Sequence, residues 1–579
     1  MIRLAGYLKY FKREVIIGPF FKLLEAIFEL IVPLVMASII DVGIKNGDKA
    51  YVLQRGGIIL LLGAMGLIFA LICQYSAARA SQGFGTKVRN DLFSHINTLS
   101  HGELDQLGTN FLITVITNDI NQMQLAVAML IRLVVRVPLL IIGAAVMATI
   151  LDVKLSFVFF IVIPLVSVVL YVIMKNSIPF YKSRQKALDR VSLITRENLM
   201  GARVIRAFSK QEEEEKRFEE ANGAVAQIAI RVGKITAFLN PATFTIMNAA
   251  IIAIIWFGGM RVNTGSLTQG EIIAFINYMT QISLALVVAA NLVIIFTKAS
   301  ASAARINQVF DIKTSLVEGT SQLDGIKSDS LAPKFSLKQV SFAYPGSKEF
   351  ALEDINLDIM GGETIGIIGG TGSGKSTLVN LLPRFYDVTK GEILMNGLPL
   401  HDYSFEALRK KFGIVPQNAV LLYGSIWDNM RWTKADASKE EIKRAINIAQ
   451  AEEFVEKLPK RYDTILLQGG KNLSGGQRQR LTIARALVGK PQVLILDDSA
   501  SALDYATEAR LRKALVDNCK GMTIFTVSQR AGTIKHADKI IVLEDGRVVG
   551  IGKHSELMNT CEVYKEICLS QLSSEEVNR

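Results

Sequence analysis

Cysteine and histidine are scarce in this chain of 579 residues, which has four cysteines and five histidines. The cysteines are Cys73, Cys519, Cys561 and Cys568, and they do not form the two close pairs that a zinc site usually requires. Scattered thiols of this kind suit a reducing cytosol and argue against a disulfide framework. From the pattern of the first residues we expect no cleavable signal peptide.

Charged residues are absent from several long stretches of the N-terminal half. Four stretches, 56–78, 155–174, 235–260 and 272–297, each reach the roughly 20 residues that a helix needs to cross a bilayer. Two weaker apolar runs, around 16–40 and at 137–151, are interrupted or preceded by charged side chains. We therefore predict an α-helical membrane domain with six transmembrane helices, some of them continuing well into the cytoplasm.

The N-terminal segment has a pattern of its own. Leu4, Tyr7, Leu8 and Phe11 share one face of a helix over residues 3–14, with the basic residues elsewhere. This arrangement predicts an amphipathic helix that lies on the surface of the lipid bilayer.

Lysine and arginine gather in the two long connections, 79–131 and 175–234, whereas the other links, near 44–52, 152–154 and 261–271, are short. Because cytoplasmic loops carry an excess of these residues, the long connections and both termini are predicted to be cytoplasmic. The same loops account for the net charge of +12, so we expect no nucleic-acid partner.

Each long connection has a polar stretch where the chain is expected to reverse direction. These reversals are predicted near 113–123 and 207–218, and their central residues are Asn118, Asp119, Phe208 and Gln211. The run Glu212–Glu215 that follows the second reversal is more simply a solvated helix face.

The composition changes after about residue 311. Residues 312–334 are polar and are predicted to form a linker. From 335 to 579, short β-branched runs alternate with helical segments, which predicts a soluble α/β domain after the membrane domain of residues 1–311.

A phosphate-binding loop occupies 369–377, where GGTGSGKST fits the pattern G-x-x-x-x-G-K-[ST]. A short apolar strand precedes it and a helix follows, as the motif requires. Backbone N–H groups of such a loop cradle phosphates, a lysine reaches the β and γ phosphates, and a serine hydroxyl binds Mg²⁺. We thus predict ATP and Mg²⁺ as ligands of Gly369, Gly370, Thr371, Gly372, Ser373, Gly374, Lys375, Ser376 and Thr377.

Other residues of this half complete a nucleotide site. Tyr344 ends a predicted strand and could stack on adenine or simply pack. Gln417 ends another strand and could touch Mg²⁺ or a water, and Asp497 closes the buried strand 493–497, where phosphate-loop enzymes hold their metal. Residues 473–477, LSGGQ, form a second glycine-rich turn ahead of a helix.

These motifs, in this order and after six spans, resemble the ATP-binding cassette exporters over essentially the whole chain. The resemblance implies that two such chains form one transporter and that each ATP lies between one phosphate loop and the LSGGQ of the other chain. It further implies that the two polar reversals are coupling helices, one docking on its own side and the other on the partner, and that Gln417 reports the nucleotide state to the membrane domain. The residues that would act on the partner's ATP are Leu473, Ser474, Gly475, Gly476, Gln477 and Asp504.

Two residues depart from the pattern of that family. Asp498 stands where a glutamate polarises the attacking water, and aspartate is shorter by one CH₂. Gln529 stands where the family has a histidine, and an amide cannot carry the charge of an imidazolium. Gln468, just before LSGGQ, replaces a frequent glutamate and is a milder change.

No histidine of the chain is expected to replace the missing one at position 529. The five are His95, His101, His401, His536 and His554.

The chain thus keeps the residues expected to hold Mg-ATP, and an intact LSGGQ, but lacks those expected to activate water. This combination resembles the degenerate-site subunit of heterodimeric bacterial multidrug exporters. It implies a homologous half-transporter as partner, with glutamate and histidine at the matching positions, in the bacterial cytoplasmic membrane. We expect an ATP-driven translocase that moves amphipathic compounds or drugs outward.

Other interpretations remain open. They are a homodimeric lipid or peptide exporter, an ATP-gated or regulatory subunit that does not pump, sequence drift without functional consequence, and an enzyme that is slow in both sites. Glu25, Glu29, Arg132 and Arg136 lie within predicted spans and are either functional or simply close enough to the cytoplasm to reach it. Four further residues would suit an apolar cavity or ordinary packing equally well: Phe244, Met247, Tyr278 and Met279.

Overall fold

The computed structural model describes residues 2–321 and 332–571. It divides into two compact units. The first, the membrane unit, comprises residues 1–97 and 110–312, and the second, the nucleotide unit, comprises 98–109 and 313–579. The stretch 322–331 of the predicted linker lies outside the described residues.

The membrane unit contains six helices that are long and apolar enough to cross a bilayer, which confirms the predicted number. Two of them are interrupted by π-helical turns, the first at Ile39–Ile44 and the third at Val115–Asp119 and Leu130–Val134. The first two spans contain α2 (Lys12–Ser38) and α3 (Lys49–Thr98), and the third contains α5 (Thr109–Thr114), α6 (Ile120–Met129) and α7 (Arg136–Leu151). The fourth span is α8 (Val153–Ala207), the fifth combines α9 (Gln211–Ala237) and α10 (Leu239–Asn263), and the sixth is α11 (Gln269–Asp311).

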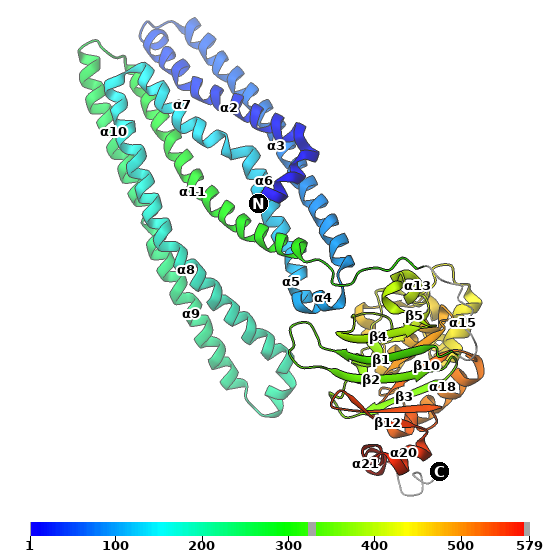
Figure 1. The fold of residues 1–579 in the computed structure, drawn as a ribbon. Coiled ribbons are helices and arrows are strands. Elements are labelled where there is room, and N and C mark those ends of the chain that lie inside the picture. Colours follow the sequence, from blue (N-terminus) through cyan, green and yellow to red (C-terminus); the bar gives the residue numbers. More distant parts are fainter. Residues whose placement is uncertain (1, 322–331, 572–579) are drawn as a thin grey trace. The chain divides into compact units, whose positions relative to one another are not determined.

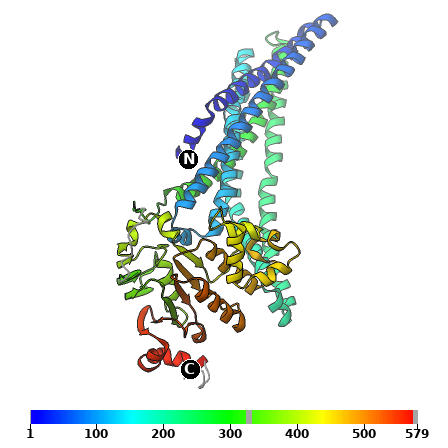
Figure 2. The same cartoon turned by 90° about the vertical axis from the view of Figure 1, so that its right-hand side faces the viewer.

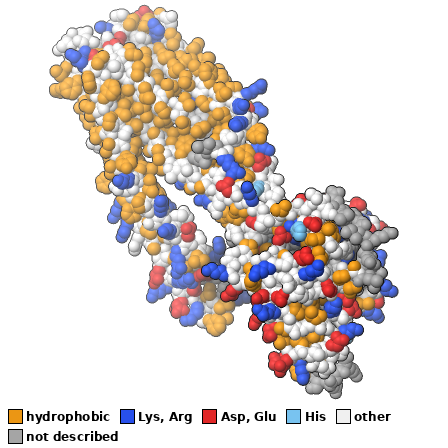
Figure 3. Space-filling model, viewed as in Figure 1, with side chains coloured by type: hydrophobic (Ala, Val, Ile, Leu, Met, Phe, Trp, Pro, Cys, Tyr) orange, Lys and Arg blue, Asp and Glu red, His pale blue; other side chains and the backbone are white. Residues whose placement is uncertain are grey.

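Hydrophobic side chains cover much of the visible face of this unit, and lysine and arginine side chains gather along the lower parts of α8 and α9 (Figure 3). Leu60, Ile161 and Trp256 are among the large apolar side chains that remain exposed. An exposed apolar band of this extent is expected where lipid replaces water as the solvent. Inside the unit, Tyr278 is fully buried and its hydroxyl donates to the Leu30 carbonyl over 2.8 Å, which joins α11 to α2.

The N-terminal segment consists of α1 (Ile2–Ala5) and a 3₁₀ turn (Gly6–Phe11). Leu4 is buried, and the Tyr7 ring meets Phe84 of α3 edge-on at 6.3 Å. A Cβ on Gly83 would lie only 2.3 Å from the Phe11 ring, so the glycine makes room for that ring. Part of the apolar face that we expected to face the bilayer surface therefore packs on α3 instead.

α8 and α9 run side by side and reverse at Phe208–Lys210, close to the second predicted reversal (Figures 1 and 2). Phe208 at this tip is 72% exposed. The first predicted reversal is wrong. The chain instead turns through α4 (His101–Leu107), which is capped by Ser100 and ends at Gly108 with φ 74°.

Asn118 and Asp119 lie within a continuous helical run rather than at a turn. Asp119 is fully buried and accepts from Arg305 Nε over 2.7 Å and from Ser302 Oγ over 2.9 Å, both on α11. The polar stretch that suggested a solvated turn therefore contains a carboxylate that joins two helices inside the unit.

A second carboxylate, Asp41, joins the π-helical turn that follows α2 to the start of α11. Asp41 accepts from the Thr268 hydroxyl over 2.6 Å and from the Gly270 N–H over 2.8 Å. A Cβ on Gly270 would lie 2.3 Å from the Ala37 carbonyl oxygen and 2.5 Å from Asp41 Oδ2. Only glycine allows the two backbones to approach this closely.

Gly270→Ala is expected to lower the stability of the membrane unit by about 1–3 kcal/mol, because the new methyl group would push against backbone that cannot rotate away. The thermal unfolding midpoint of the detergent-purified chain measures this. Gly259→Ala is the matched control, since nothing lies within 4 Å of its new Cβ. Equal midpoints for the two variants would contradict the close approach.

The nucleotide unit is built on a six-stranded sheet in the order β12-β11-β3-β10-β9-β6, of which only β12 is antiparallel to its neighbour. An antiparallel sheet, β2-β1-β4-β5, and a short pair, β7-β8, accompany it. Strands such as β9, VLILD, are buried throughout because helices cover both faces of a parallel sheet. The helices α14, α15 and α16, drawn in yellow, gather on one side of the unit in Figure 2.

The strands of this unit are β1 (Phe335–Phe342), β2 (Leu352–Ile359), β3 (Thr364–Gly369), β4 (Lys390–Met395), β5 (Leu398–Pro399), β6 (Phe412–Val415), β7 (Gly424–Ser425), β8 (Ile465–Leu466), β9 (Val493–Asp497), β10 (Thr523–Val527), β11 (Lys539–Glu544) and β12 (Arg547–Gly552). Besides α4, its α-helices are α12 (Lys375–Leu381), α13 (Phe405–Arg409), α14 (Ile426–Arg431), α15 (Lys439–Ile448), α16 (Glu452–Lys457), α17 (Gly475–Val488), α18 (Tyr505–Asn518), α19 (Ala531–Ile534), α20 (His554–Thr560) and α21 (Glu562–Gln571). The fold class predicted from the sequence, a six-helix membrane domain followed by an α/β domain, is confirmed.

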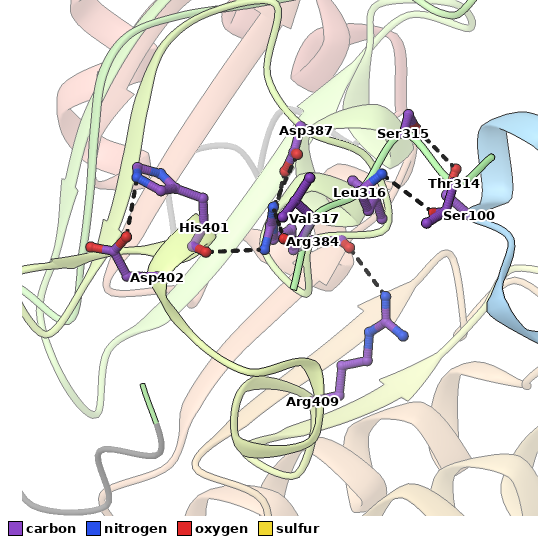
Figure 4. A network of polar contacts seen from close by, with 10 residues as sticks. All are labelled: Ser100, Thr314, Ser315, Leu316, Val317, Arg384, Asp387, His401, Asp402 and Arg409. Carbon is purple, nitrogen blue, oxygen red and sulfur yellow. Dashed lines mark hydrogen bonds and ion pairs between the residues drawn. The ribbon is translucent and has the colours of Figure 1, made fainter. Parts of the chain in front are cut away.

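The described part of the predicted linker is bound to this unit rather than free. The Arg384 guanidinium donates to the Val317 carbonyl over 2.9 Å and pairs with Asp387, as Figure 4 shows. Leu316 is buried, and Ser321 forms a β-bridge with Tyr403. Scattered polar residues in the sequence gave no sign of these backbone contacts.

Three of the four cysteines, Cys73, Cys561 and Cys568, are buried, and Cys519 is half-buried. All four are free thiols.

Candidate nucleotide site

Residues 369–374 form a loop between β3 and α12, with the left-handed backbone that the glycines permit. Gly374 has φ 93° and precedes the first residue of α12. A Cβ on Gly369 would lie 2.1 Å from the Leu543 carbonyl oxygen, so a side chain there would displace β11. The loop has the geometry of a phosphate cradle, in which successive N–H groups face one concavity.

Lys375 is 8% exposed and folds back along this loop. Its ammonium donates to the Gly369 carbonyl over 3.0 Å and to the Gly370 carbonyl over 2.5 Å. Burial lowers the pKa of Lys375, while the charges of Asp497 and Asp498 act in the opposite direction. An anionic phosphate in the loop would offset the loss of hydration that this ammonium suffers.

Ser376 donates its hydroxyl to Asp497 Oδ1 over 3.0 Å. Burial raises the pKa of Asp497, and the neighbouring Asp498 adds to this effect. A hydroxyl and a carboxylate side by side, beside a phosphate cradle, are oxygen ligands that suit Mg²⁺. These residues therefore fit the metal that accompanies ATP.

Tyr344 follows β1, and its hydroxyl lies 2.9 Å from Thr377 Oγ1. Its ring packs edge-on against Phe342 and Tyr386 at 5.0 and 5.5 Å, and the residue is 37% exposed. Both interpretations of this aromatic thus have support, since it packs on two rings and keeps part of its surface beside the phosphate loop.

Asp498 directly follows β9 and has the left-handed backbone angle φ 45°, which is uncommon for a residue with a side chain. Burial raises its pKa, whereas the Arg530 charge and a hydrogen bond from Gln417 lower it. The carboxylate expected at the position of the catalytic base therefore already interacts with Gln417, the residue expected to report the nucleotide state.

Gln529 follows β10 at the same edge of the sheet, because β10 lies parallel between β3 and β9. The carboxyl ends of parallel strands meet at one edge, which brings distant residues into a single site. The structure places the predicted residues around one cavity of about 370 Å³, lined by Tyr344, Thr371, Gly372, Gly374, Lys375, Ser376, Thr377, Gln417, Asp497, Asp498 and Gln529.

The LSGGQ residues do not line this cavity. Ser474 caps α17, accepting from the Gln477 N–H over 3.3 Å, and Leu473 is buried beneath the turn. A Cβ on Gly476 would lie 3.0 Å from the Ala502 carbonyl oxygen, so the turn rests on the segment before Asp504. Ser474 and Asp504 remain exposed at the surface, and Gln477 is half-buried.

Asp504 caps α18 by accepting from the Thr507 N–H and hydroxyl, each over 2.8 Å. These two hydrogen bonds lower the pKa of Asp504 and keep it ionised. The segment expected to cross to a partner site is thus held in a defined conformation within this chain.

Sequence reasoning missed α4 as an element of the nucleotide unit. The His101 ring stacks on Phe385 at 4.4 Å, and Tyr386 donates to Asp105 over 2.9 Å. Glu103 accepts from the Ser315 N–H over 3.1 Å. Ser100 followed three residues later by Glu103 is a capping-box pattern and was the available signal for a helix start there.

Sequence reasoning also missed Arg530. Its guanidinium donates to the Ser501 carbonyl over 3.3 Å, lies 4.0 Å from Glu508 and stacks over the Tyr505 ring at 5.4 Å. Arg530 therefore connects the segment after β10 to the segment after β9.

Among the candidates in the membrane unit, Glu29 pairs with Arg136 of α7 at 2.8 Å, and Glu25 pairs with Lys22 on its own helix at 2.7 Å. Met247, Tyr278 and Met279 are buried in the core of the unit, which favours the packing interpretation for these three. Phe244 is 64% exposed and stays available for an apolar ligand.

Comparison with known proteins agrees with this geometry. Residues 15–286 match the family described as ABC transporter transmembrane region, and residues 352–501 match the family described as ABC transporter. The chain is 37% identical to an uncharacterised ABC transporter ATP-binding protein of Bacillus subtilis, covering 99% of both chains. It is 32% identical to a putative multidrug export ATP-binding/permease protein of the same organism, covering 98% of both.

The fold also matches the solved structure of a bacterial Atm1-family ABC exporter with ATP bound. The TM-score is 0.81 at 23% identity, over 97% of this chain and 99% of that one. Both units are thus accounted for, and the chain belongs to the ABC transporters, as a half-transporter that joins one multi-pass membrane domain of the exporter fold to one ATP-binding domain.

Proposed function

We propose that this chain is the degenerate-site half of a heterodimeric exporter that moves amphipathic compounds or drugs out of a bacterial cell. Its own site would hold Mg-ATP and hydrolyse it slowly, while its LSGGQ would complete the competent site of a homologous partner. The observation that carries the proposal is the pair Asp498 and Gln529, which line the same cavity as an otherwise complete phosphate loop.

Slow hydrolysis at this site would follow from the reach of one side chain and the charge of another. A general base must lie within hydrogen-bond distance of its proton, and a misplacement of about 1 Å can cost roughly a hundredfold in rate. Asp498 is one CH₂ shorter than glutamate, and its carboxylate already accepts from Gln417. Gln529 can donate a hydrogen bond to a phosphate but supplies no positive charge.

The binding residues are unaffected by these changes. Lys375 would neutralise phosphate charge, and Ser376 and Asp497 would hold Mg²⁺, which offsets the charge of the phosphates when bound. Tyr344 would provide one face for adenine. Slow hydrolysis with intact binding would keep this site occupied and bias the partner's cycle, a coupling between two sites.

Force would pass to the membrane domain through two elements. The first is α4, which holds Phe385 and Tyr386 through His101 and Asp105. The second is the exposed Phe208 tip, proposed to dock on the partner's nucleotide domain. Asn118 and Asp119 have no place in this route, because they lie inside the membrane unit.

Both termini are proposed to be cytoplasmic, in the cytoplasmic membrane of a bacterium. The bacterial sources of the relatives and the basic side chains along α8 and α9 support this assignment. The relative named for putative multidrug export supports drugs as cargo, and the exposed Phe244 suits an apolar compound.

Single-turnover ATP hydrolysis by the purified full-length chain, alone and with a co-expressed partner half, tests the proposal. We expect negligible turnover alone and clear turnover by the pair, which Asp498→Ala leaves mostly intact. Lys375→Ala, which should abolish ATP binding by the chain alone, is the control for an occupied site. Brisk turnover by the chain alone that Asp498→Ala abolishes would instead establish a competent homodimer.

A further inference from the structure

The segment that carries Gln529 has an unusual partner. Gln529, at a bend, and Arg530, with extended backbone, connect β10 to α19, so they lie beyond the sheet ladder that holds β10 in place. The backbone N–H and C=O groups of such a segment have no neighbouring strand to pair with, so a side chain or water must satisfy them. That partner comes from the C-terminal helix.

Gln571, at the end of α21, binds this segment with both ends of its carboxamide. Its Oε1 accepts from the Ala531 N–H over 2.9 Å, and its Nε2 donates to the Gln529 carbonyl over 2.9 Å. A carboxamide has one acceptor and one donor side by side, so it can pair with an N–H and a C=O two residues apart, as a neighbouring strand would. Neither a carboxylate nor an aliphatic side chain can form both bonds at neutral pH.

The helix that carries Gln571 is itself fixed. Tyr564 and Cys568 of α21 are fully buried in one cluster with Ala531 and Ile534 of α19 and with Ile368 of β3, the strand that leads into the phosphate loop. The Tyr564 hydroxyl lies 2.8 Å from His554 Nδ1 of α20. The carboxamide is therefore presented from a packed surface, so its position is defined relative to β3 as well as to the Gln529 segment.

We propose that Gln571 is a positioning residue of the nucleotide site, which holds the backbone at Gln529–Ala531 so that the Gln529 side chain faces the nucleotide. The inference does not require the site to be slow, because it concerns where Gln529 lies and not how fast the reaction runs. The two hydrogen bonds of Gln571 hold the residues on either side of Arg530, so α21 also helps to position the Arg530 backbone, whose side chain reaches the Ser501 carbonyl.

The test combines amide hydrogen exchange with equilibrium binding of a fluorescent ATP analogue and Mg²⁺ to the full-length chain. Gln571→Leu removes both hydrogen bonds at similar size. We expect exchange of the Ala531 amide to rise roughly tenfold or more, and nucleotide binding to weaken about threefold to tenfold. Ser570→Ala is the matched control, because that hydroxyl donates to the Ile567 carbonyl of its own helix and, among the described residues, touches neither Gln529 nor Ala531, so neither quantity should change.

A double-mutant cycle separates positioning from general support. If Gln571 acts through Gln529, then Gln571→Leu should weaken binding much less in a Gln529→Ala background than in the native one. Gln571→Glu keeps the acceptor and loses the donor at neutral pH, so it should weaken nucleotide binding in the native background and much less in the Gln529→Ala background.

Three results would overturn the proposal. They are unchanged Ala531 exchange in Gln571→Leu, additive effects of the two substitutions on nucleotide binding, and a lowered thermal midpoint with faster exchange throughout α20 and α21. The last result would make Gln571 a part of the helix packing only. The absolute rate of hydrolysis, which tests the proposed function, enters none of these comparisons.

Discussion

Replacing Asp498 by glutamate is expected to raise single-turnover ATP hydrolysis by this chain about a hundredfold, since a shortfall of roughly 1 Å can cost that much. The added CH₂ would carry the carboxylate beyond Gln417, with which Asp498 now interacts, and towards the space that an attacking water would occupy. Combining it with Gln529→His should raise the rate further, because an imidazole can carry a positive charge beside the phosphate.

Asp498→Asn is the control for that experiment. It preserves size and hydrogen bonding but cannot accept a proton, so its rate should be no higher than that of the native chain. Nucleotide affinity should change little in either variant, because neither touches Lys375 or Ser376. A rate for Asp498→Glu equal to the native rate would show that something other than the length of this side chain limits hydrolysis.

The largest loss of stability is expected from Arg305→Ala. Asp119 is fully buried, and without the guanidinium its one remaining partner among the residues that the structure describes would be the Ser302 hydroxyl. Removing one member of a buried ion pair typically costs about 3–5 kcal/mol, because the other charge stays buried without compensation. The measurement is the thermal midpoint of the detergent-purified chain.

Changing the other partner of the pair, Asp119→Asn, should lower the free energy of unfolding less, by about 1–2 kcal/mol. The amide oxygen can still accept a hydrogen bond, and the half-exposed Arg305 can turn towards water. Lys298→Ala, an exposed lysine on the same helix, should leave the midpoint unchanged. The order of the midpoints is therefore the critical observation. If Asp119→Asn proved more damaging than Arg305→Ala, the buried carboxylate would not be the group that needs a partner.

Much of the nucleotide site could be predicted from the sequence, because a phosphate loop requires particular residues at fixed spacing. Gly369, Gly374 and Lys375 are set by backbone angles and charge, and those requirements leave a local signature. The spans could be predicted for a similar reason, since about 20 uncharged residues in a row have few other uses.

What could not be predicted depended on residues far apart in the chain. Asp119 looked like part of a solvated turn until Arg305, 186 residues later, was placed beside it. Residues 313–321 looked like a free linker because backbone groups that bind Arg384 leave no mark in composition. Likewise, nothing in the sequence around Gln571 predicts its hydrogen bonds to Gln529 and Ala531.

The distribution of thiols has a practical consequence for watching this transporter move. With three thiols enclosed and only Cys519 partly open, a water-soluble maleimide should label one native position, and slowly, because burial raises the pKa of the Cys519 thiol. A single Cys519→Ser change would then leave a nearly silent background. Cysteines introduced at exposed positions such as Phe208 could carry spin labels or fluorophores, and distances between them would follow the transport cycle directly.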